Sequence, residues 1–385
     1  MTRAQPHVSV AMITYNHERF VGEAVASMLE QTYGDFELII VDDGSTDATG
    51  EIVRRFRDPR ILYVRQENQG PSQARNTALA MTRGTLVAQM SGDDVAVPTR
   101  LERQIACHSA HPKSVVFSHC SFIDDAGRRI ESPRIDTRIN RPNWTREATL
   151  RYLFRQGNCL LAPSAVAARS AFEAVGTYNP VMLQLQDCDM WVRFLLAGYE
   201  PVIVQEPLIR YRVRDDGGNL SSPTQEVKVR SDFERRLLLR SFLTIDNARA
   251  LAAIFPEAAA LGYPLEDRLV PFLLAMIGLN VEPRIDALHV FAADLLLHMM
   301  QEPATRKMLG ETVGFALPDL FRVVGSIDPF DAERMRRRAA GAERTRRRAV
   351  ALERQLNDLI GSRTWRLARA LRDLTSGMRA LINRR

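Results

Sequence analysis

Polar side chains follow three short apolar runs in the first hundred residues, in each case where the run ends. They are Thr14 and Asn16 after residues 8–13, Asp42 and Asp43 after 36–41, and Asp93 and Asp94 after 85–90. Adjacent carboxylates repel each other, and a divalent cation relieves that repulsion. Mg²⁺ and Mn²⁺ prefer such oxygen ligands and bridge them to phosphate oxygens. The clusters predict a site for a cation and a phosphate-bearing ligand, against the alternative of solvated turns that cap helices.

A further pair of carboxylates, Asp187 and Asp189, lies at the start of a helical pattern at 187–196. A carboxylate near a reacting hydroxyl acts as a general base. Asp187 is the predicted base, with Asp189 as the second choice. The alternative interpretation is that Asp187 only caps the helix.

Helical patterns separate the apolar runs, so the first half of the chain predicts βαβ units around a parallel sheet. Strands are expected at 8–13, 36–41, 61–64 and 85–90, with Ser45 or Thr46 capping the helix that ends near 56. Ligands of such sheets bind at the carboxyl ends of the strands, where the polar clusters lie. Neither GxGxxG nor GxxxxGK[ST] follows the first strand, which disfavours a dinucleotide oxidoreductase, a P-loop NTPase and a nucleotidyltransferase.

The order and spacing of these motifs resemble glycosyltransferase family 2 over about residues 7–222. The motifs that carry the resemblance are Thr14-Tyr15-Asn16, Asp42-Asp43-Gly44-Ser45-Thr46-Asp47, Asn68-Gln69-Gly70 with Ala74-Arg75-Asn76, Ser91-Gly92-Asp93-Asp94, Gln186-Asp187-Cys188-Asp189-Met190-Trp191, Tyr211-Arg212 and Asn219-Leu220-Ser221. The resemblance implies a GT-A fold, which is Rossmann-like α/β with a mostly parallel sheet, an inverting mechanism and a nucleotide-sugar donor. UDP- or dTDP-sugars are the expected donors.

By the same resemblance, each motif residue acquires an expected role. Thr14 and Asn16 would line the nucleoside pocket, Asp43 would bind the base, and Arg75 would lie near base or diphosphate. Asp94 would bind Mg²⁺ or Mn²⁺ directly with Asp93 beside it, Asp187 would be the catalytic base, and Arg212 could pair with the diphosphate. Two positions depart from the family: Ser91 stands where Asp is frequent, and Gln186 where Glu is frequent.

Three regions follow from the patterns. Residues 1–225 are the expected GT-A domain, with a nucleotide-binding half at 1–97 and an acceptor half at 98–225. Residues 226–330 read as successive helices, and 331–385 as an amphipathic, Arg-rich helical tail.

Trp191 has two interpretations: it either stacks on a sugar ring or packs in the core beside its helix.

Charge is distributed unevenly along the 385 residues. The segment 334–385 holds 16 Arg, no Lys and 4 acids, so the rest of the chain carries −6 of the net +6. Such a tail favours contact with an anionic membrane surface, self-association as a coiled coil, or a solvated helix. Nucleic-acid binding is disfavoured because the body is acidic and contains no recognisable readout module.

Composition limits the cellular setting. The four cysteines form no CxxC pair, which excludes a disulfide scaffold, disfavours structural zinc and predicts reduced thiols. No apolar run reaches the ~18 residues of a membrane-spanning helix, and the N-terminus does not resemble a signal peptide. We therefore expect a cytoplasmic protein, peripheral at the inner face of the cytoplasmic membrane if the tail binds lipid.

The prediction is an inverting, metal-dependent glycosyltransferase that adds a sugar to a glycan or lipid-linked glycan in bacterial cell-surface polysaccharide synthesis. The alternative is a GT-A-like binding or scaffold protein without turnover, tethered by its tail.

Overall fold

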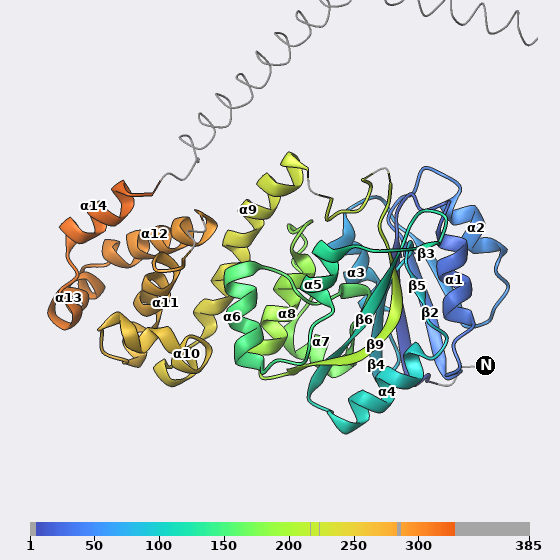
Figure 1. Ribbon diagram of the computed structural model, residues 1–385, viewed down its shortest axis with the longest axis horizontal. Helices are drawn as coiled ribbons and strands as arrows, with labels where there is room; N and C mark the ends of the chain where they lie inside the picture. The colour runs from blue at the N-terminus through green and yellow to red at the C-terminus, as the bar shows by residue number, and fades with distance from the viewer. Residues whose placement is uncertain (1–4, 216, 223, 283–285, 328–385) are drawn as a thin grey trace, which may run out of the picture. The chain divides into compact units, whose positions relative to one another are not determined.

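The computed structural model describes residues 5–215, 217–222, 224–282 and 286–327 (Figure 1). Contacts group the chain up to Val324 into one compact unit. The tail at 331–385 lies outside the described residues, so its helical structure, membrane contact and self-association stay predictions.

The first half of the chain alternates strands and helices, as its periodicity predicts. The elements are β1 (Val8–Thr14), α1 (Val21–Leu29), β2 (Phe36–Asp42), α2 (Thr49–Arg55), β3 (Ile61–Arg65), α3 (Pro71–Ala80) and β4 (Leu86–Ser91). Their strands are parallel in the order β3-β2-β1-β4. Thr14 pairs with Asp42, and Ile13 pairs with Ser91. The register therefore brings all three predicted polar clusters to one edge of the sheet.

The second half extends the same sheet with mixed strand directions. The elements are β5 (Val95–Ala96), α4 (Arg100–Ala110), β6 (Ser114–Ile123), β7 (Arg129–Ile130), α5 (Pro133–Ile139), α6 (Arg146–Gln156), β8 (Val166–Ala168), α7 (Arg169–Val175), α8 (Gln186–Leu196) and β9 (Glu200–Arg212). Strand β8 is antiparallel to β4 and β6, whereas β9 is parallel to β6. The predicted α/β class with a mostly parallel central sheet is confirmed.

Helices cover both faces of the sheet. One core joins α1, α2 and α4 to the sheet, and the other joins α3, α6, α7 and α8 (Figure 1). All seven residues of β2 are consequently buried, as expected of a strand covered on both sides. Trp191 is 1% exposed and meets Phe117 edge-on at 5.0 Å between ring centroids. Core packing, not sugar stacking, is therefore its role.

Helices dominate after residue 225, as predicted. They are α9 (Gln225–Arg240), α10 (Ala248–Ile254), α11 (Val270–Leu279), α12 (Asp286–Gln301), α13 (Pro303–Val313) and α14 (Leu317–Gly325). Phe154 of α6 packs on Phe242 and Phe255, with ring centroids 5.0 and 4.9 Å apart. This region therefore shares its hydrophobic core with one face of the sheet.

Two further features concern the thiols and the lengths of the helices. All four cysteines are free thiols, and three of them are buried. Among the residues described, no helix has the length and apolar character needed to cross a bilayer.

Candidate functional site

Two loops interlock at the carboxyl ends of β1 and β2. Asn16 adopts a left-handed backbone with φ 52°, which Asn tolerates better than most residues. Its N–H donates to Ser45 Oγ at 2.9 Å, and its Oδ1 accepts from the Thr46 N–H at 2.8 Å. Thr14 is buried at 2% exposure. The predicted nucleoside-pocket residues therefore lie on a loop pair braced by its own polar groups.

The start of α2 differs from the prediction. Ser45 and Thr46 do not cap this helix, because their polar groups bond to Asn16. Instead, Asp47 Oδ1 accepts from the Thr49 N–H at 3.0 Å. Hydrogen bonds from the neighbouring loop thus override the local capping preference.

The two carboxylates after β2 have separate partners. Asp42 is fully buried and accepts from the Ser45 N–H and from the Tyr63 hydroxyl, both at 2.8 Å. Asp43 is 5% exposed and accepts from Gln66 Nε2 and from two backbone N–H groups, those of Gln69 and Gly70, at 2.7–3.0 Å. Asp43, the predicted base-binding residue, therefore also holds the loop at 66–70 against the sheet edge.

Arg212 is buried at 1% exposure, and every part of its guanidinium is engaged. Nε donates to the Asp93 carbonyl at 2.8 Å, Nη1 to the Asp124 carbonyl at 2.6 Å, and Nη2 to Glu23 Oε2 at 2.5 Å. Its backbone N–H donates to Asp94 Oδ1 at 2.9 Å. The sequence pattern predicts a diphosphate-pairing arginine here, but in this conformation the side chain joins α1, the acidic loop and the turn after β6.

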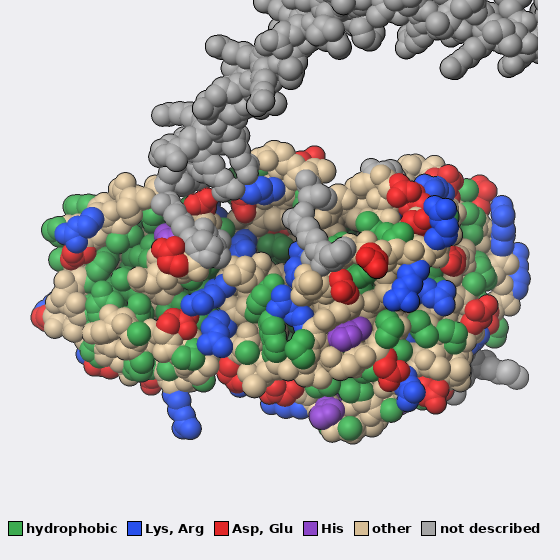
Figure 2. All heavy atoms as spheres, in the orientation of Figure 1, with side chains coloured by type: hydrophobic (Ala, Val, Ile, Leu, Met, Phe, Trp, Pro, Cys, Tyr) green, Lys and Arg blue, Asp and Glu red, His purple; other side chains and the backbone are tan. Residues whose placement is uncertain are grey.

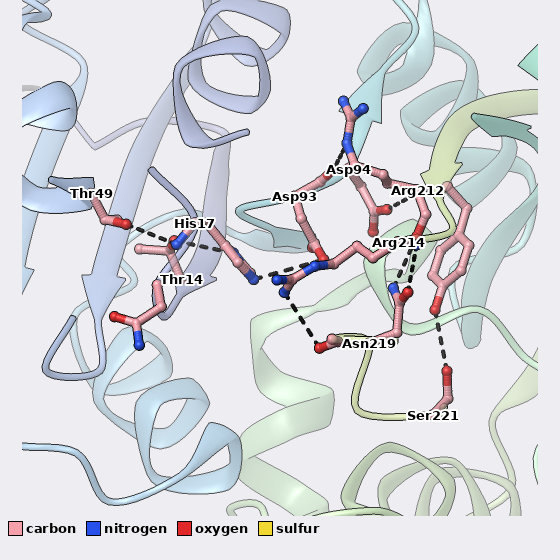
Figure 3. Close-up of polar contacts among 12 residues, drawn as sticks. Thr14, His17, Thr49, Asp93, Asp94, Arg212, Arg214, Asn219 and Ser221 are labelled. Carbon is pink, nitrogen blue, oxygen red and sulfur yellow. Dashed lines mark hydrogen bonds and ion pairs between the residues drawn. The ribbon is translucent and has the colours of Figure 1, made fainter. Parts of the chain in front are cut away.

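Asp93 and His17 face each other at the site, with 3.7 Å between Asp93 Oδ2 and His17 Nε2 (Figure 3). The guanidinium of Arg214 extends toward both and helps to lower the pKa of His17, which burial lowers most. The sequence analysis missed Arg214 because it stands only two residues from the motif arginine. Its place in the loop directly after β9, two residues beyond Tyr211-Arg212, was the available signal.

Asp94 is 2% exposed, and burial together with the Asp93 charge raises its pKa well above the usual range. A bound divalent cation would reverse both effects, since it favours ionised carboxylates. Three or more candidate ligands do not gather at one point among the described residues. Asp93 and Asp94 fit a cation of the kind that keeps water and phosphate oxygens as its remaining ligands.

Asp187 lies in the first turn of α8 and is half-buried. Its Oδ2 accepts from Asn158 Nδ2 and its Oδ1 from the Cys188 N–H, both at 2.7 Å. Burial raises its pKa, and the positive charge of Arg75 opposes that rise. Asp189 is 4% exposed and paired with Arg193 at 2.9 Å. Of the two carboxylates, Asp187 is thus the one in a position to accept a proton.

Arg75 lies in a buried polar region with Gln89 and Tyr178. Its Nη1 donates to Gln89 Oε1 at 2.7 Å, and its guanidinium lies over the Tyr178 ring at 5.7 Å. Arg75 Nε, Gln89 Nε2 and the Tyr178 hydroxyl find no hydrogen-bond partner among the described residues. Such orphaned groups are costly unless water or a ligand pairs with them. Arg75 therefore acts on Asp187 through its charge and also borders a buried polar region where a water molecule or a polar ligand would supply the missing hydrogen bonds.

Glu234 fixes the segment that leads into Asp187. This α9 residue is 5% exposed, and its carboxylate accepts from three consecutive N–H groups, those of Leu183, Gln184 and Leu185, at 2.7–2.8 Å. These groups precede α8, where helix N–H groups lack intrahelical partners and favour negative charge. Glu234 is about fifty positions away in sequence, so no local motif predicts this contact.

Sequence comparisons find glycosyltransferases. Residues 9–176 match the model of glycosyl transferase family 2. EpsE of Bacillus subtilis (strain 168), named as a glycosyltransferase, is 31% identical over 267 residues, which is 68% of this chain and 85% of EpsE. An uncharacterized glycosyltransferase of Methanocaldococcus jannaschii is 29% identical over 223 residues, 56% of this chain and 74% of that relative.

A structural comparison finds the same fold. The crystal structure of S. aureus TarS 1–349 in complex with UDP-GlcNAc aligns with a TM-score of 0.52 at 20% identity, over 79% of this chain and 90% of that chain. At this identity the likeness concerns the fold.

We predict that Glu234→Gln lowers the free energy of unfolding by about 1–3 kcal/mol, because an amide cannot accept from all three N–H groups. Glu226→Gln on the same helix is the matched control, since the Glu226 side chain is 78% exposed and, within the described part of the chain, pairs with Arg230 alone. Urea denaturation of both variants measures the difference. Equal stability of the two would show that the Glu234 contact is not holding the segment.

Proposed function

This chain belongs to glycosyl transferase family 2, and on this premise we propose that it transfers a sugar from a nucleotide-sugar donor with inversion at the anomeric carbon. The chain is a glycosyltransferase; the donor, the metal dependence, the inversion and a role in bacterial cell-surface polysaccharide synthesis are the proposal. The observation that supports it is the Asp187 carboxylate, which accepts a hydrogen bond from Asn158 and whose pKa is lowered by the positive charge of Arg75.

The proposed reaction is a single displacement. The acceptor hydroxyl oxygen bonds to the anomeric carbon while the bond from that carbon to the diphosphate oxygen breaks. The hydroxyl proton passes to Asp187, and the electron pair leaves with the diphosphate. General-base help of this kind contributes typically 10²–10⁴-fold in rate. Attack opposite to the leaving group inverts the anomeric configuration.

Residues at the edge of the sheet would stabilise the negative charge that develops on the leaving diphosphate. Asp93 and Asp94 would hold a divalent cation, and such an ion neutralises the charge that develops on a departing diphosphate. Arg214, whose guanidinium lies beside Asp93, is the proposed phosphate-pairing arginine in place of Arg212. Arg212 would instead keep the acidic loop in position.

The remaining motif residues are proposed to bind the donor. Thr14 and Asn16 would line the nucleoside pocket, and Asp43 would act on the base from the loop it holds. Arg75 Nε, Gln89 Nε2 and the Tyr178 hydroxyl lack partners among the described residues, which supports a ligand with polar atoms beside them, such as the sugar or phosphate oxygens of the donor. TarS is the neighbour whose structure contains UDP-GlcNAc, so UDP-sugars come first in a test, followed by dTDP-sugars.

The first test is a donor screen. Full-length protein with Mg²⁺ or Mn²⁺ is incubated with a panel of nucleotide sugars, and calorimetric binding and nucleoside diphosphate release are both measured. We expect one donor to bind only when metal is present. Asp94→Asn should weaken binding by tenfold or more, whereas Asp187→Asn should keep binding and lose release by 10²-fold or more.

The outcomes separate the alternatives. Metal-dependent binding with no loss of cellular function in Asp187→Asn would favour the scaffold interpretation. No binding of any nucleotide sugar would overturn the donor assignment.

A pH profile tests the base. Because burial raises the pKa of Asp187 and the carboxylate must be ionised to accept a proton, kcat should fall as pH decreases, at a pH above the ordinary range of Asp. Arg75→Met should move this fall in kcat to higher pH, because it removes the positive charge that lowers the pKa of Asp187. Arg75→Lys keeps that charge and should move the fall less. Rates are measured at saturating donor. If kcat of Arg75→Met fell at the same pH as in the wild type, the charge of Arg75 would not affect the proton acceptor.

Arg214, just after the end of β9, can be tested against Arg210, which lies within that strand. Arg214→Gln should raise the donor Kd by about 10–100-fold, the cost of a lost charge-assisted contact to phosphate. The control is Arg210→Gln, an exposed arginine of the same segment. Thermal melting of both variants checks the fold. A donor Kd equal to that of the control would return the phosphate-binding role to another residue.

A further inference from the structure

A cavity of about 890 Å³ opens between α9 and α12. Its wall is mainly apolar, with Leu183, Phe233, Leu237, Phe291 and Leu295 among the lining residues. Phe233 is 64% exposed, an unusual state for a large aromatic side chain. Figure 2 shows further hydrophobic side chains gathered over this helical part of the molecule. We call this cavity the α9–α12 groove.

The groove adjoins the segment that carries the proposed base. Leu183 and Glu234 both line it, and these two residues are partners in the contact that precedes α8. Asp187 follows four residues after Leu183. Because Asp187 would receive the acceptor's proton, the Leu183–Glu234 contact links the groove to the segment that carries this carboxylate.

Three arginines line the groove, together with the acidic residues Glu234 and Asp294. Arg236 pairs with Asp294, and Arg230 pairs with Glu226 at 2.5 Å. Arg240 is exposed and has no ion pair or side-chain hydrogen bond with the residues described. The groove thus combines an apolar wall with a cation that has no partner within the described residues.

We propose that the α9–α12 groove binds the hydrocarbon chain of an anionic lipid, a single-chain lipid phosphate or diphosphate that carries the acceptor sugar. This rests on the proposed function and names its acceptor class. The hydrocarbon chain would pack on Phe233 and Leu237, and the phosphate would pair with Arg240. A chain of several carbons gains binding energy from each buried methylene.

Charge argues against the two other occupants. The segment 334–385 carries 16 Arg and 4 acids, so it would bring further positive charge toward Arg240. A two-fold dimer would place the same patch of both copies together, and Arg240 would approach its own copy or the neighbouring arginines. An anionic amphiphile matches both the apolar wall and the positive charge of Arg240.

The test uses farnesyl diphosphate, a water-soluble isoprenoid anion, with the full chain and calorimetry. Saturating UDP and Mg²⁺ are present, so that binding at the nucleotide site does not contribute. We expect saturable binding that Phe233→Ser and Arg240→Ser each weaken by tenfold or more. Phe321→Ser is the matched control, because Phe321 is also 64% exposed but lies on α14, outside the groove lining. Inorganic diphosphate and farnesol, the anion and the chain alone, should each bind more weakly.

Four results would overturn the proposal, and the first three are read from binding and light scattering. They are no binding, equal binding by wild type and Phe233→Ser, and a dimer seen by light scattering that Phe233→Ser converts to monomer. A benzophenone crosslinker in place of Phe233 that reacts with the chain's own 328–385 segment would assign the groove to the tail. Donor binding is read in the same samples. Its loss would sink the proposed function, whereas its retention without farnesyl diphosphate binding would sink the groove alone.

Discussion

The site depends on one buried arginine. Arg212 takes a full positive charge out of water, and this is tolerated because its donors reach Glu23 of α1, the carbonyl of Asp93 and the carbonyl of Asp124. Each partner comes from a different element, so the guanidinium fixes the acidic loop relative to the sheet and to α1. Removing one partner of a buried charge is far more costly than the net value of the pair. Arg212 therefore fixes the positions of Asp93 and Asp94. Any cation or diphosphate bound by these carboxylates would depend on the same contacts.

The sequence predicts what periodicity and strand order control. The first four strands, the helices between them and the three polar clusters at one sheet edge follow from apolar runs and from the rule for parallel sheets. It predicts less well which partner a polar group selects. Ser45 and Thr46 were expected to cap α2, yet Asn16 uses them, because the loop after β1 lies nearer than local rules can show. Arg212 has the motif position but is buried, and its neighbour Arg214 faces Asp93 instead.

Contacts between distant segments are the part that no local pattern contains. Glu234 bonds to three N–H groups about fifty residues earlier, and Asn158 reaches Asp187 across twenty-nine positions. Through Glu234, the helices after residue 225 make polar contacts with the segment before α8, in addition to the aromatic packing of Phe154 on Phe242 and Phe255. Both the groove beside α9 and the carboxylate at the start of α8 depend on the same short segment, 183–185.

The Glu234 contact limits how the chain can be recombined. A chimera that joins residues 1–225 to the helices of another family member would keep all the recognised motifs. It would place three N–H groups at the start of α8 without an acceptor unless the donated helices offered a carboxylate at the corresponding turn. Exchange of whole helical regions between family members therefore requires a carboxylate that matches these three N–H groups. Motif-complete sequences that lack that carboxylate need a different solution for the same segment.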